Sequence, residues 1–322
     1  MGFNCETIAD FEAAAHWYEA LHAATPDHPS APDALYSAAV FRRSMGELSA
    51  ALADTRALAD AQDPRASGLL IDLGRALEAA EQWEDAAALY GEFADSPPAH
   101  ATPEQHTFAR LASASTAQHL GRQAEAEAIW QALLDDGVTG EVFAEAAYSL
   151  LVPRLSAYQA MRIDGVQRPG QPRNFDQRLQ RQLKEKTAAF QVLQADLAVV
   201  IDAGSLRWGL AAFVDLGEAY EDMATALLAA PVPTNLTPEQ LEMYEDRIKD
   251  YAYTQEQRAI EAYSLVMTRS MQVRSYDEST ATALGRLEVL DPTSWPGLSE
   301  DLIRAGFTTG SGYGVGIMDQ PE

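Results

Sequence analysis

Along the first half of the chain, a small residue is repeatedly followed four positions later by a larger one. The small residue is always alanine, and successive alanines are separated by 37, 35 and 40 residues. The pairs are Ala14/Tyr18, Ala51/Thr55, Ala86/Tyr90 and Ala126/Trp130. Residues four apart share one face of an α-helix, and no stretch shows the sustained alternation of a half-buried strand. The pattern therefore predicts an all-α chain in which one kind of helix recurs.

Turn and stop signals flank these helices at fixed positions. Gly46, Glu81 and Gly121 each stand five residues before the alanine, where we expect a tight turn. Pro26 and Pro98 each stand twelve residues after it, and proline cannot continue a helix beyond its first turn. Each copy is therefore predicted to be a helix, a tight turn and a second helix that stops near a proline.

Residues 67–98 resemble the tetratricopeptide repeat (TPR), a helix–turn–helix unit of 34 residues. The matching positions are Leu73-Gly74 in the first helix and Ala86, Tyr90 and Pro98 in the second, with Leu77 where tyrosine is usual. The resemblance implies a TPR-like α-solenoid over residues 1–140, in which small residues lie where helices cross. A generic helical bundle is the alternative architecture.

The first copy is incomplete. Residues 1–8 correspond to the end of a first helix, and Phe11–Ala24 correspond to a complete second helix. The ends of solenoids need a polar cap. We therefore expect either that this chain continues a longer protein or that another element covers its N-terminal edge.

The second half, residues 141–305, is predicted to be helical with longer elements. A long helix is expected over 175–203, and Phe213-x-x-Leu216-Gly217-x-x-Tyr220 repeats the first-helix signature. Its second helix is expected only around Ala259 and Tyr263, after an insertion at 231–254 with a short helix of its own. Thr237-Pro238-Glu239-Gln240 forms a capping box for that helix, and Thr102-Pro103-Glu104-Gln105 repeats it. A further helix is expected at 277–290, a short one at 298–305, and a flexible tail over 306–322.

The charge of the chain limits its partners. Forty-eight Asp and Glu residues against 23 Lys and Arg give a formal charge of −25. Such a surface repels nucleic-acid phosphates and anionic membranes. Residues 153–186 are the exception, with eight basic and three acidic side chains; we call Arg168, Arg173, Arg178 and Arg181 in this segment the basic stripe. The stripe either docks an acidic partner or, as we favour, pairs with the protein's own acidic helices across an interface between the two halves.

The sequence offers little to support catalysis or a cofactor. Cys5 is the single cysteine, and none of the six histidines has a second ligand at the spacing of a known metal motif. There is no phosphate-binding loop and no apolar run near 18 residues. We therefore expect no enzyme activity, no cofactor, no metal and no membrane insertion. The compartment, cytoplasm or periplasm, is left open.

The resemblance to TPR proteins implies a scaffold that binds a protein or peptide along the concave surface formed by successive first helices. The inward-facing candidates are Tyr36, Val40, Arg43, Ile71, Arg75, Glu78, Phe108, Leu111, Ser115 and Gln118. Packing between helices is the alternative role of each. Some family members clamp a peptide carboxylate with two lysines and two asparagines. Gly68, Asp72 and Arg75 occupy the comparable region here, so we do not expect that form of recognition.

Two other functions fit the second half of the chain. Residues 141–305 are loosely similar to the C-terminal regions of large bacterial TPR proteins of cell-envelope and gliding-motility complexes. That similarity favours a structural module within a multi-subunit assembly. The third alternative is an enzyme in which the 231–254 insertion forms a lid over a pocket beside Trp208 and Tyr220.

Overall fold

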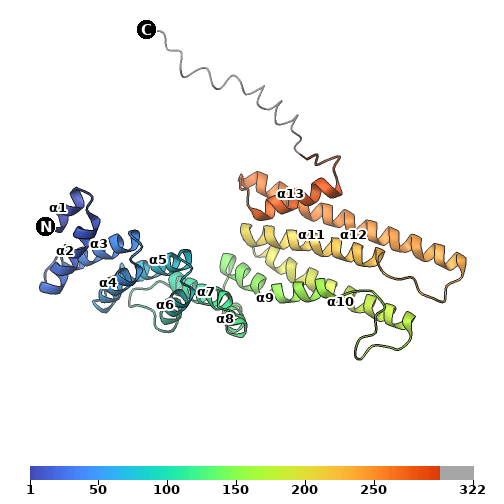
Figure 1. Cartoon of the computed structure of the whole chain (residues 1–322), viewed down its shortest axis with the longest axis horizontal. Helices are drawn as coiled ribbons and strands as arrows, with labels where there is room; N and C mark the ends of the chain where they lie inside the picture. The colour runs from blue at the N-terminus through green and yellow to red at the C-terminus, as the bar shows by residue number, and fades with distance from the viewer. Residues whose placement is uncertain (298–322) are drawn as a thin grey trace, which may run out of the picture. The chain divides into compact units, whose positions relative to one another are not determined.

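The computed structural model describes residues 1–297, which contain thirteen α-helices and no strand (Figure 1). The predicted all-α fold is confirmed. The chain forms two compact units that divide between Leu150 and Leu151. The sequence predicts the domain boundary at 140/141. A helix begins there and runs through the division between the two units. The predicted helix at 298–305 and tail at 306–322 lie outside the described residues.

The first unit is a series of antiparallel helical hairpins in which each helix contacts the next. Its helices are α1 (Gly2–Thr7), α2 (Phe11–Ala24), α3 (Ala31–Ser44), α4 (Leu48–Asp60), α5 (Ala66–Ala79), α6 (Trp83–Asp95), α7 (Pro103–His119) and α8 (Gln123–Asp135). In addition, α3 contacts α5 and α5 contacts α7, so the first helices of successive hairpins lie side by side. This order of contacts is that of a helical-repeat stack.

A residue with positive φ turns the chain inside every hairpin of this unit. Gly46 and Gly121 have φ of +80° and +74°, and Glu81 has φ of +56°. Ala9, with φ of +60°, has the same role between α1 and α2. All four stand five residues before the register alanine. The predicted turns at 46, 81 and 121 are present, and the left-handed residue at 9 completes the series.

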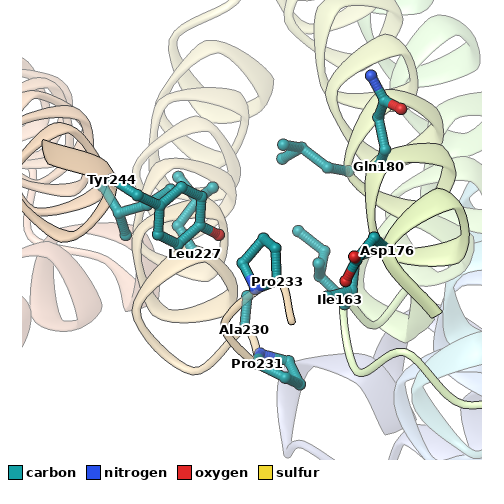
Figure 2. A pocket seen from close by; sticks show the side chains of 11 residues that line it. Ile163, Asp176, Gln180, Leu227, Ala230, Pro231, Pro233 and Tyr244 are labelled. Carbon is teal, nitrogen blue, oxygen red and sulfur yellow. The ribbon is translucent and has the colours of Figure 1, made fainter. Parts of the chain in front are cut away.

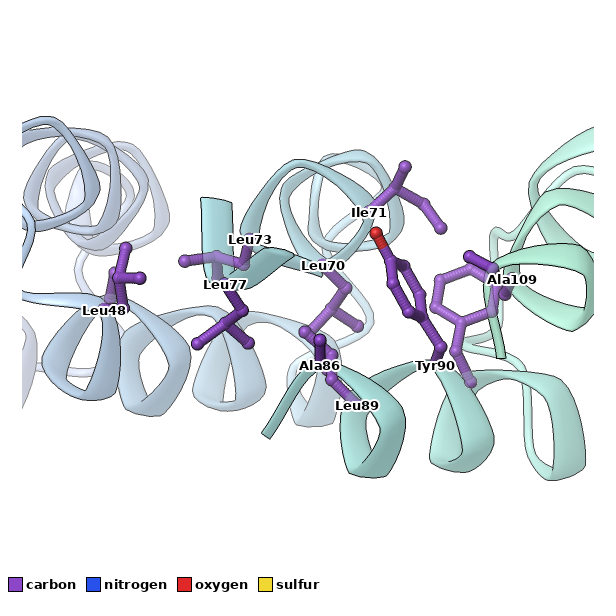
Figure 3. Close-up of a cluster of buried hydrophobic side chains, with 12 residues drawn as sticks. Leu48, Leu70, Ile71, Leu73, Leu77, Ala86, Leu89, Tyr90 and Ala109 are labelled. Carbon is purple, nitrogen blue, oxygen red and sulfur yellow. The ribbon is translucent and has the colours of Figure 1, made fainter. Parts of the chain in front are cut away.

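The register alanines lie at the helix crossings. Ala14, Ala51, Ala86 and Ala126 have no exposed surface, and the large residues Tyr90 and Trp130 are buried with them. Figure 3 shows the central core cluster, in which Leu70 of α5 lies beside Ala86 and Leu89 of α6. The small–large pattern thus records side chains that pack between the helices.

A second contact holds the hairpins together, between a glycine and a tyrosine sixteen residues later. A Cβ atom added at Gly74 would lie 2.4 Å from the Tyr90 ring, and one added at Gly2 would lie 2.6 Å from Tyr18. The two other hairpins have the buried alanines Ala39 and Ala114 at the equivalent position. The tyrosine ring can lie against the first helix only where that helix has no Cβ.

The second unit is built from longer helices. They are α10 (Phe175–Asp202), α11 (Leu206–Leu228), α12 (Pro238–Val273) and α13 (Glu278–Leu290), together with the end of α9 (Gly140–Ala160). α11 contacts α10, α12 and α13. Its core joins Leu210 and Phe213 to Tyr263 and Val266 of α12 and Leu287 of α13.

One predicted feature of this unit is wrong. The sequence predicts a short helix inside the 231–254 insertion, followed by a separate helix around Ala259 and Tyr263. The structure has one helix of 36 residues instead, capped at Thr237 as expected. Since no Gly or Pro occurs between Glu239 and Val273, nothing interrupts the backbone hydrogen bonds.

The division between the two units falls within α9, which contains Pro153 in its interior. Proline has no N–H, so the carbonyl of Ser149 loses its usual helical donor. The division between Leu150 and Leu151 therefore falls in the turn where α9 lacks one backbone hydrogen bond.

Candidate functional site

The candidate surface of the first unit lies on α3, α5 and α7, the first helices of three hairpins. All ten residues predicted to face inward lie on these three helices. Val40 packs, partly buried, against the cluster that contains Leu35 and Leu58, which leaves nine to consider. What the nine side chains contact decides which of them a partner can reach.

Two of the predicted residues are not on an accessible surface. Ile71 and Leu111 are each only 6% exposed and belong to core clusters. Both lie on the side of their helix that packs against other helices. We therefore assign both side chains to the core and not to the surface that a partner contacts.

Arg75 and Phe108 form a contact pair on this surface. The Arg75 guanidinium carbon lies 4.6 Å from the centroid of the Phe108 ring, and its side chain is 57% exposed. Phe108 in turn meets the buried Tyr90 edge to face, with centroids 6.0 Å apart. Arg75 belongs to α5 and Phe108 to α7, so this cation–π contact links two successive repeats.

Similar contacts link α3 to α5. Arg43 donates to Asp72 at 2.8 Å. The guanidinium of Arg65 lies 4.6 Å from the Tyr36 ring centroid and donates to Asp33 at 2.8 Å. The arginines on this surface are thus held in place by acidic and aromatic neighbours from the adjacent repeat.

The remaining candidates are Glu78, Ser115 and Gln118. Ser115 donates to the Leu111 carbonyl oxygen at 3.2 Å and to Glu145 at 3.3 Å. Burial raises the pKa of Glu78, which lies near the Tyr90 hydroxyl. Gln118 is exposed at the end of α7. Of the nine, Arg75 and Gln118 are the most accessible.

The basic stripe is occupied with contacts inside its own segment. Arg178 donates to the carbonyl oxygens of Gly165 at 2.8 Å and Pro172 at 3.2 Å. Arg181 donates to the Gly170 carbonyl oxygen at 2.8 Å and pairs with Glu185 at 2.7 Å.

Arg168 pairs with Asp164 at 2.7 Å, and Arg173 contributes its carbonyl oxygen as an acceptor for Arg178 at 2.5 Å. These contacts fasten the 161–174 loop to α10. The sequence predicted pairing with acidic helices across an interface between the two halves, whereas the acceptors found here are loop carbonyl oxygens, Asp164 and Glu185, all within the second unit.

Sequence reasoning missed Lys186, which is fully buried in the second unit. Its ammonium lies 2.5 Å from Asp222, 2.9 Å from the Met161 carbonyl oxygen and 3.3 Å from that of Tyr158. The ammonium therefore caps the end of α9 and ties it to α11. Helical spacing from Leu179 and Phe190 places position 186 on the buried face, and this signal was available in the sequence.

The enzyme alternative placed a pocket beside Trp208 and Tyr220. The insertion does line a pocket, but at the far end of α11, near Leu227, and neither Trp208 nor Tyr220 contributes to its wall. Asp176 is the one carboxylate among its lining residues. Across residues 1–297, no three His, Cys, Asp or Glu side chains gather in a way that suits a metal ion.

Comparisons with known proteins address the fold. No protein-family model matches the sequence, and no curated protein matches it. The chain is similar in structure to a TPR repeats protein from Bacteroides fragilis NCTC 9343, at 12% identity and a TM-score of 0.38, over 80% of this chain and 98% of that one. It is also similar to a TPR protein from Parabacteroides merdae ATCC 43184, at 13% identity and a TM-score of 0.34, over 90% and 95% of the two chains. Both matches are to bacterial TPR proteins.

Proposed function

We propose that the first unit is a non-catalytic docking module that binds a protein or peptide along α3, α5 and α7. The observation that carries the proposal is the Arg75–Phe108 pair, a half-exposed cation stacked on an aromatic ring between two repeats. Arginine and aromatic side chains dominate the energetics of protein interfaces.

The neighbouring contacts support the same proposal. Arg43 and Arg65 are already held by Asp72 and Asp33. A partner that binds side chains fixed in this way loses less conformational entropy than one that must order them. Arg43, Arg65 and Arg75 are matched in number by Asp33, Asp72 and Glu78, so this group of side chains has both signs of charge to offer a partner.

The class of partner follows from charge and hydropathy. The acidic chain disfavours nucleic acid. Among residues 1–297, none of the helices combines the length and apolar character that crossing a bilayer requires. A protein or peptide is therefore the proposed partner.

Site-specific photo-crosslinking tests this proposal. A photoreactive phenylalanine analogue replaces Gln118, which is exposed on α7, and, as a matched control, Ala88, which is exposed on α6. Irradiation in a lysate of the source organism is expected to yield a discrete crosslinked protein from position 118 and none from position 88. Equal crosslinking from both positions, or none from position 118, would contradict docking on α7.

A second candidate function is a structural module within a larger bacterial assembly. It is favoured by apolar side chains on the outside of α10, where Val192 is 55% and Val199 is 49% exposed. Exposed apolar groups on one face of a helix suit contact with another subunit. A crosslinker at position 199 distinguishes the two functions, because assembly through α10 predicts a crosslink there and docking on α7 does not.

A further inference from the structure

The second unit contains a pocket of about 300 Å³ between α10, α11 and α12 (Figure 2). Leu179 and Leu183 of α10 form one wall, and Tyr244 and Ile248 of α12 form the other. Leu227 closes the inner end, and Pro231 and Pro233 of the insertion form the base. The pocket is about twice the size of an engineered cavity that binds benzene, and it lies at the lower end of the range for ligand sites.

Hydrogen bonds to Asp176 hold the loop that forms the base. Asp176, in the first turn of α10, accepts from the Thr234 N–H at 2.8 Å and from the Asn235 amide at 2.7 Å. The Thr234 hydroxyl donates to the same carboxylate at 3.1 Å. Pro231 and Pro233 have fixed φ angles, so the loop is restrained from within as well. The pocket is therefore formed before any ligand arrives.

The lining is apolar except at Tyr244, Asp176 and Gln180, and the Gln180 amide points away from the prolines in Figure 2. The side chain of Tyr244 extends toward the prolines in Figure 2, so its hydroxyl offers one polar group. Burial raises the pKa of Tyr244, and the hydroxyl stays uncharged at neutral pH. Asp176 is the one charged side chain in the lining, and the Thr234 and Asn235 groups that donate to it are all uncharged. Its negative charge attracts a cation beside it and repels a carboxylate.

We infer that this pocket binds a small hydrophobic amine, with the apolar body among Leu179, Leu227 and Ile248 and the ammonium beside Asp176. The site is independent of α3, α5 and α7, and it neither requires nor excludes the docking proposed for the first unit. The ligand class follows from the apolar walls, the volume and the negative charge of Asp176.

Occupancy of the pocket is measured with N-phenyl-1-naphthylamine, an uncharged aromatic amine that fluoresces in apolar surroundings. Ala230 lines the pocket, whereas its neighbour Ala229 is exposed. Ala230→Trp is expected to weaken probe binding at least about tenfold, and Ala229→Trp to leave it unchanged. If Ala230→Trp lacks the circular dichroism of the folded protein, Ile248→Trp replaces it in the experiment, because it fills the pocket from α12.

The charge of the ligand is tested by displacing the probe with octylamine and octanoate, which have equal chain lengths. Octylamine is expected to displace it at about one tenth of the octanoate concentration, and Asp176→Asn is expected to narrow that ratio. Absence of saturable probe binding, binding unaffected by both tryptophan variants, or equal displacement by octanoate would overturn the proposal.

Discussion

The hairpins α5/α6 and α11/α12, one from each unit, use the same glycine–tyrosine contact across very different chain lengths. Gly74 and Tyr90 are sixteen residues apart, and Gly217 and Tyr263 are forty-six apart. A Cβ atom would lie 2.4 Å from the ring in the first hairpin and 2.6 Å in the second. The close crossing therefore defines the hairpin, and the helices beyond it can lengthen to accommodate an insertion.

The two hairpins differ in what their tyrosine hydroxyls bind. Tyr263 donates to Glu221 at 2.7 Å, and Glu221 also accepts from Arg286 of α13. In the first unit, Glu78 lies near the Tyr90 hydroxyl, but Arg75 is directed to Phe108 of the next repeat. Burial, followed by the nearby carboxylate, raises the pKa of Tyr90. In the second unit Arg286 thus helps to join three helices, whereas in the first unit Arg75 lies on the surface.

The largest expected effect comes from adding a methyl group at either crossing. Gly74→Ala and Gly217→Ala should each lower the free energy of unfolding of their own unit by about 3 kcal/mol, because the buried tyrosine ring cannot move away. Hydrogen exchange measured by mass spectrometry assigns the loss to residues 1–150 or to residues from 151 onward.

Each unit provides a matched control for this comparison. Gly91 in α6 and Gly285 in α13 are helical glycines with nothing within 4 Å of an added Cβ. Gly91→Ala and Gly285→Ala should raise stability by about 0.5–1 kcal/mol through helix propensity. If all four substitutions acted alike, the close crossing would not be what defines these hairpins.

Next in size is the loss of the Lys186 ammonium. Lys186→Met removes this donor from Asp222 and from the Met161 carbonyl oxygen, whereas the Tyr158 carbonyl oxygen still accepts from the Met161 N–H at 3.0 Å. Breaking a fully buried pair costs about 3–5 kcal/mol, and because the Asp222 side chain is 25% exposed we expect about 2 kcal/mol.

Urea unfolding of Lys186→Met, Asp222→Asn and the double variant measures this coupling. The double variant should lose clearly less than the sum of the single ones. The loss should be confined to the second unit, and strict additivity would show that the two side chains do not interact.

A smaller effect concerns pH in the first unit. Burial, together with Glu19, raises the pKa of Asp54 to about 6 from 3.8, while Arg42 opposes the shift. The folded state therefore binds this proton more tightly, so the contribution of Asp54 to stability falls as pH rises from about 4 to 6 and is constant above.

Asp54→Asn should consequently stabilise the first unit by about 1 kcal/mol at pH 7.5 and by nearly nothing at pH 4. Thermal unfolding at the two pH values checks this. A stabilisation that is equal at both would contradict the raised pKa of Asp54.

The smallest expected effect is the loss of an N-cap hydrogen bond, which can be compared between the two identical capping boxes. Thr102 and Thr237 each accept from the backbone N–H three residues later. Thr102→Ala should cost about 1 kcal/mol, because α7 is packed within the first unit. Thr237→Ala should cost about half as much, since many residues of the first turns of α12 are exposed and fraying there is local. Equal shifts in melting temperature would show that this end of α12 is as tightly coupled to its core as α7.

Much of the fold follows from local sequence signals. Alanine at helix crossings, glycine turns and capping boxes each act within a few residues, and the sequence alone places them. The turn at Ala9 carries no such signal, because a positive φ is unusual for alanine. The continuity of α12 was predictable from the absence of Gly and Pro. It was missed because the insertion at 231–254 was assigned a separate short helix.

The candidate surface was less predictable. The repeat register identified first helices but not which side of each helix the neighbouring hairpin covers, so Ile71 and Leu111 were expected to be accessible. Contacts such as Arg75 with Phe108 join residues 33 positions apart and depend on how the repeats stack. Lys186 is the opposite case. A lysine is expected on the surface from composition alone, but its helical position is buried.

The most direct test of docking on α3, α5 and α7 is the affinity of the partner captured from position 118 for two arginine variants. Arg75 and Arg122 are 57% and 51% exposed, and each has an acidic residue three positions away. Isothermal titration should show that Arg75→Ala weakens binding at least about tenfold, while Arg122→Ala leaves it unchanged. Equal affinities for the two variants would contradict the account.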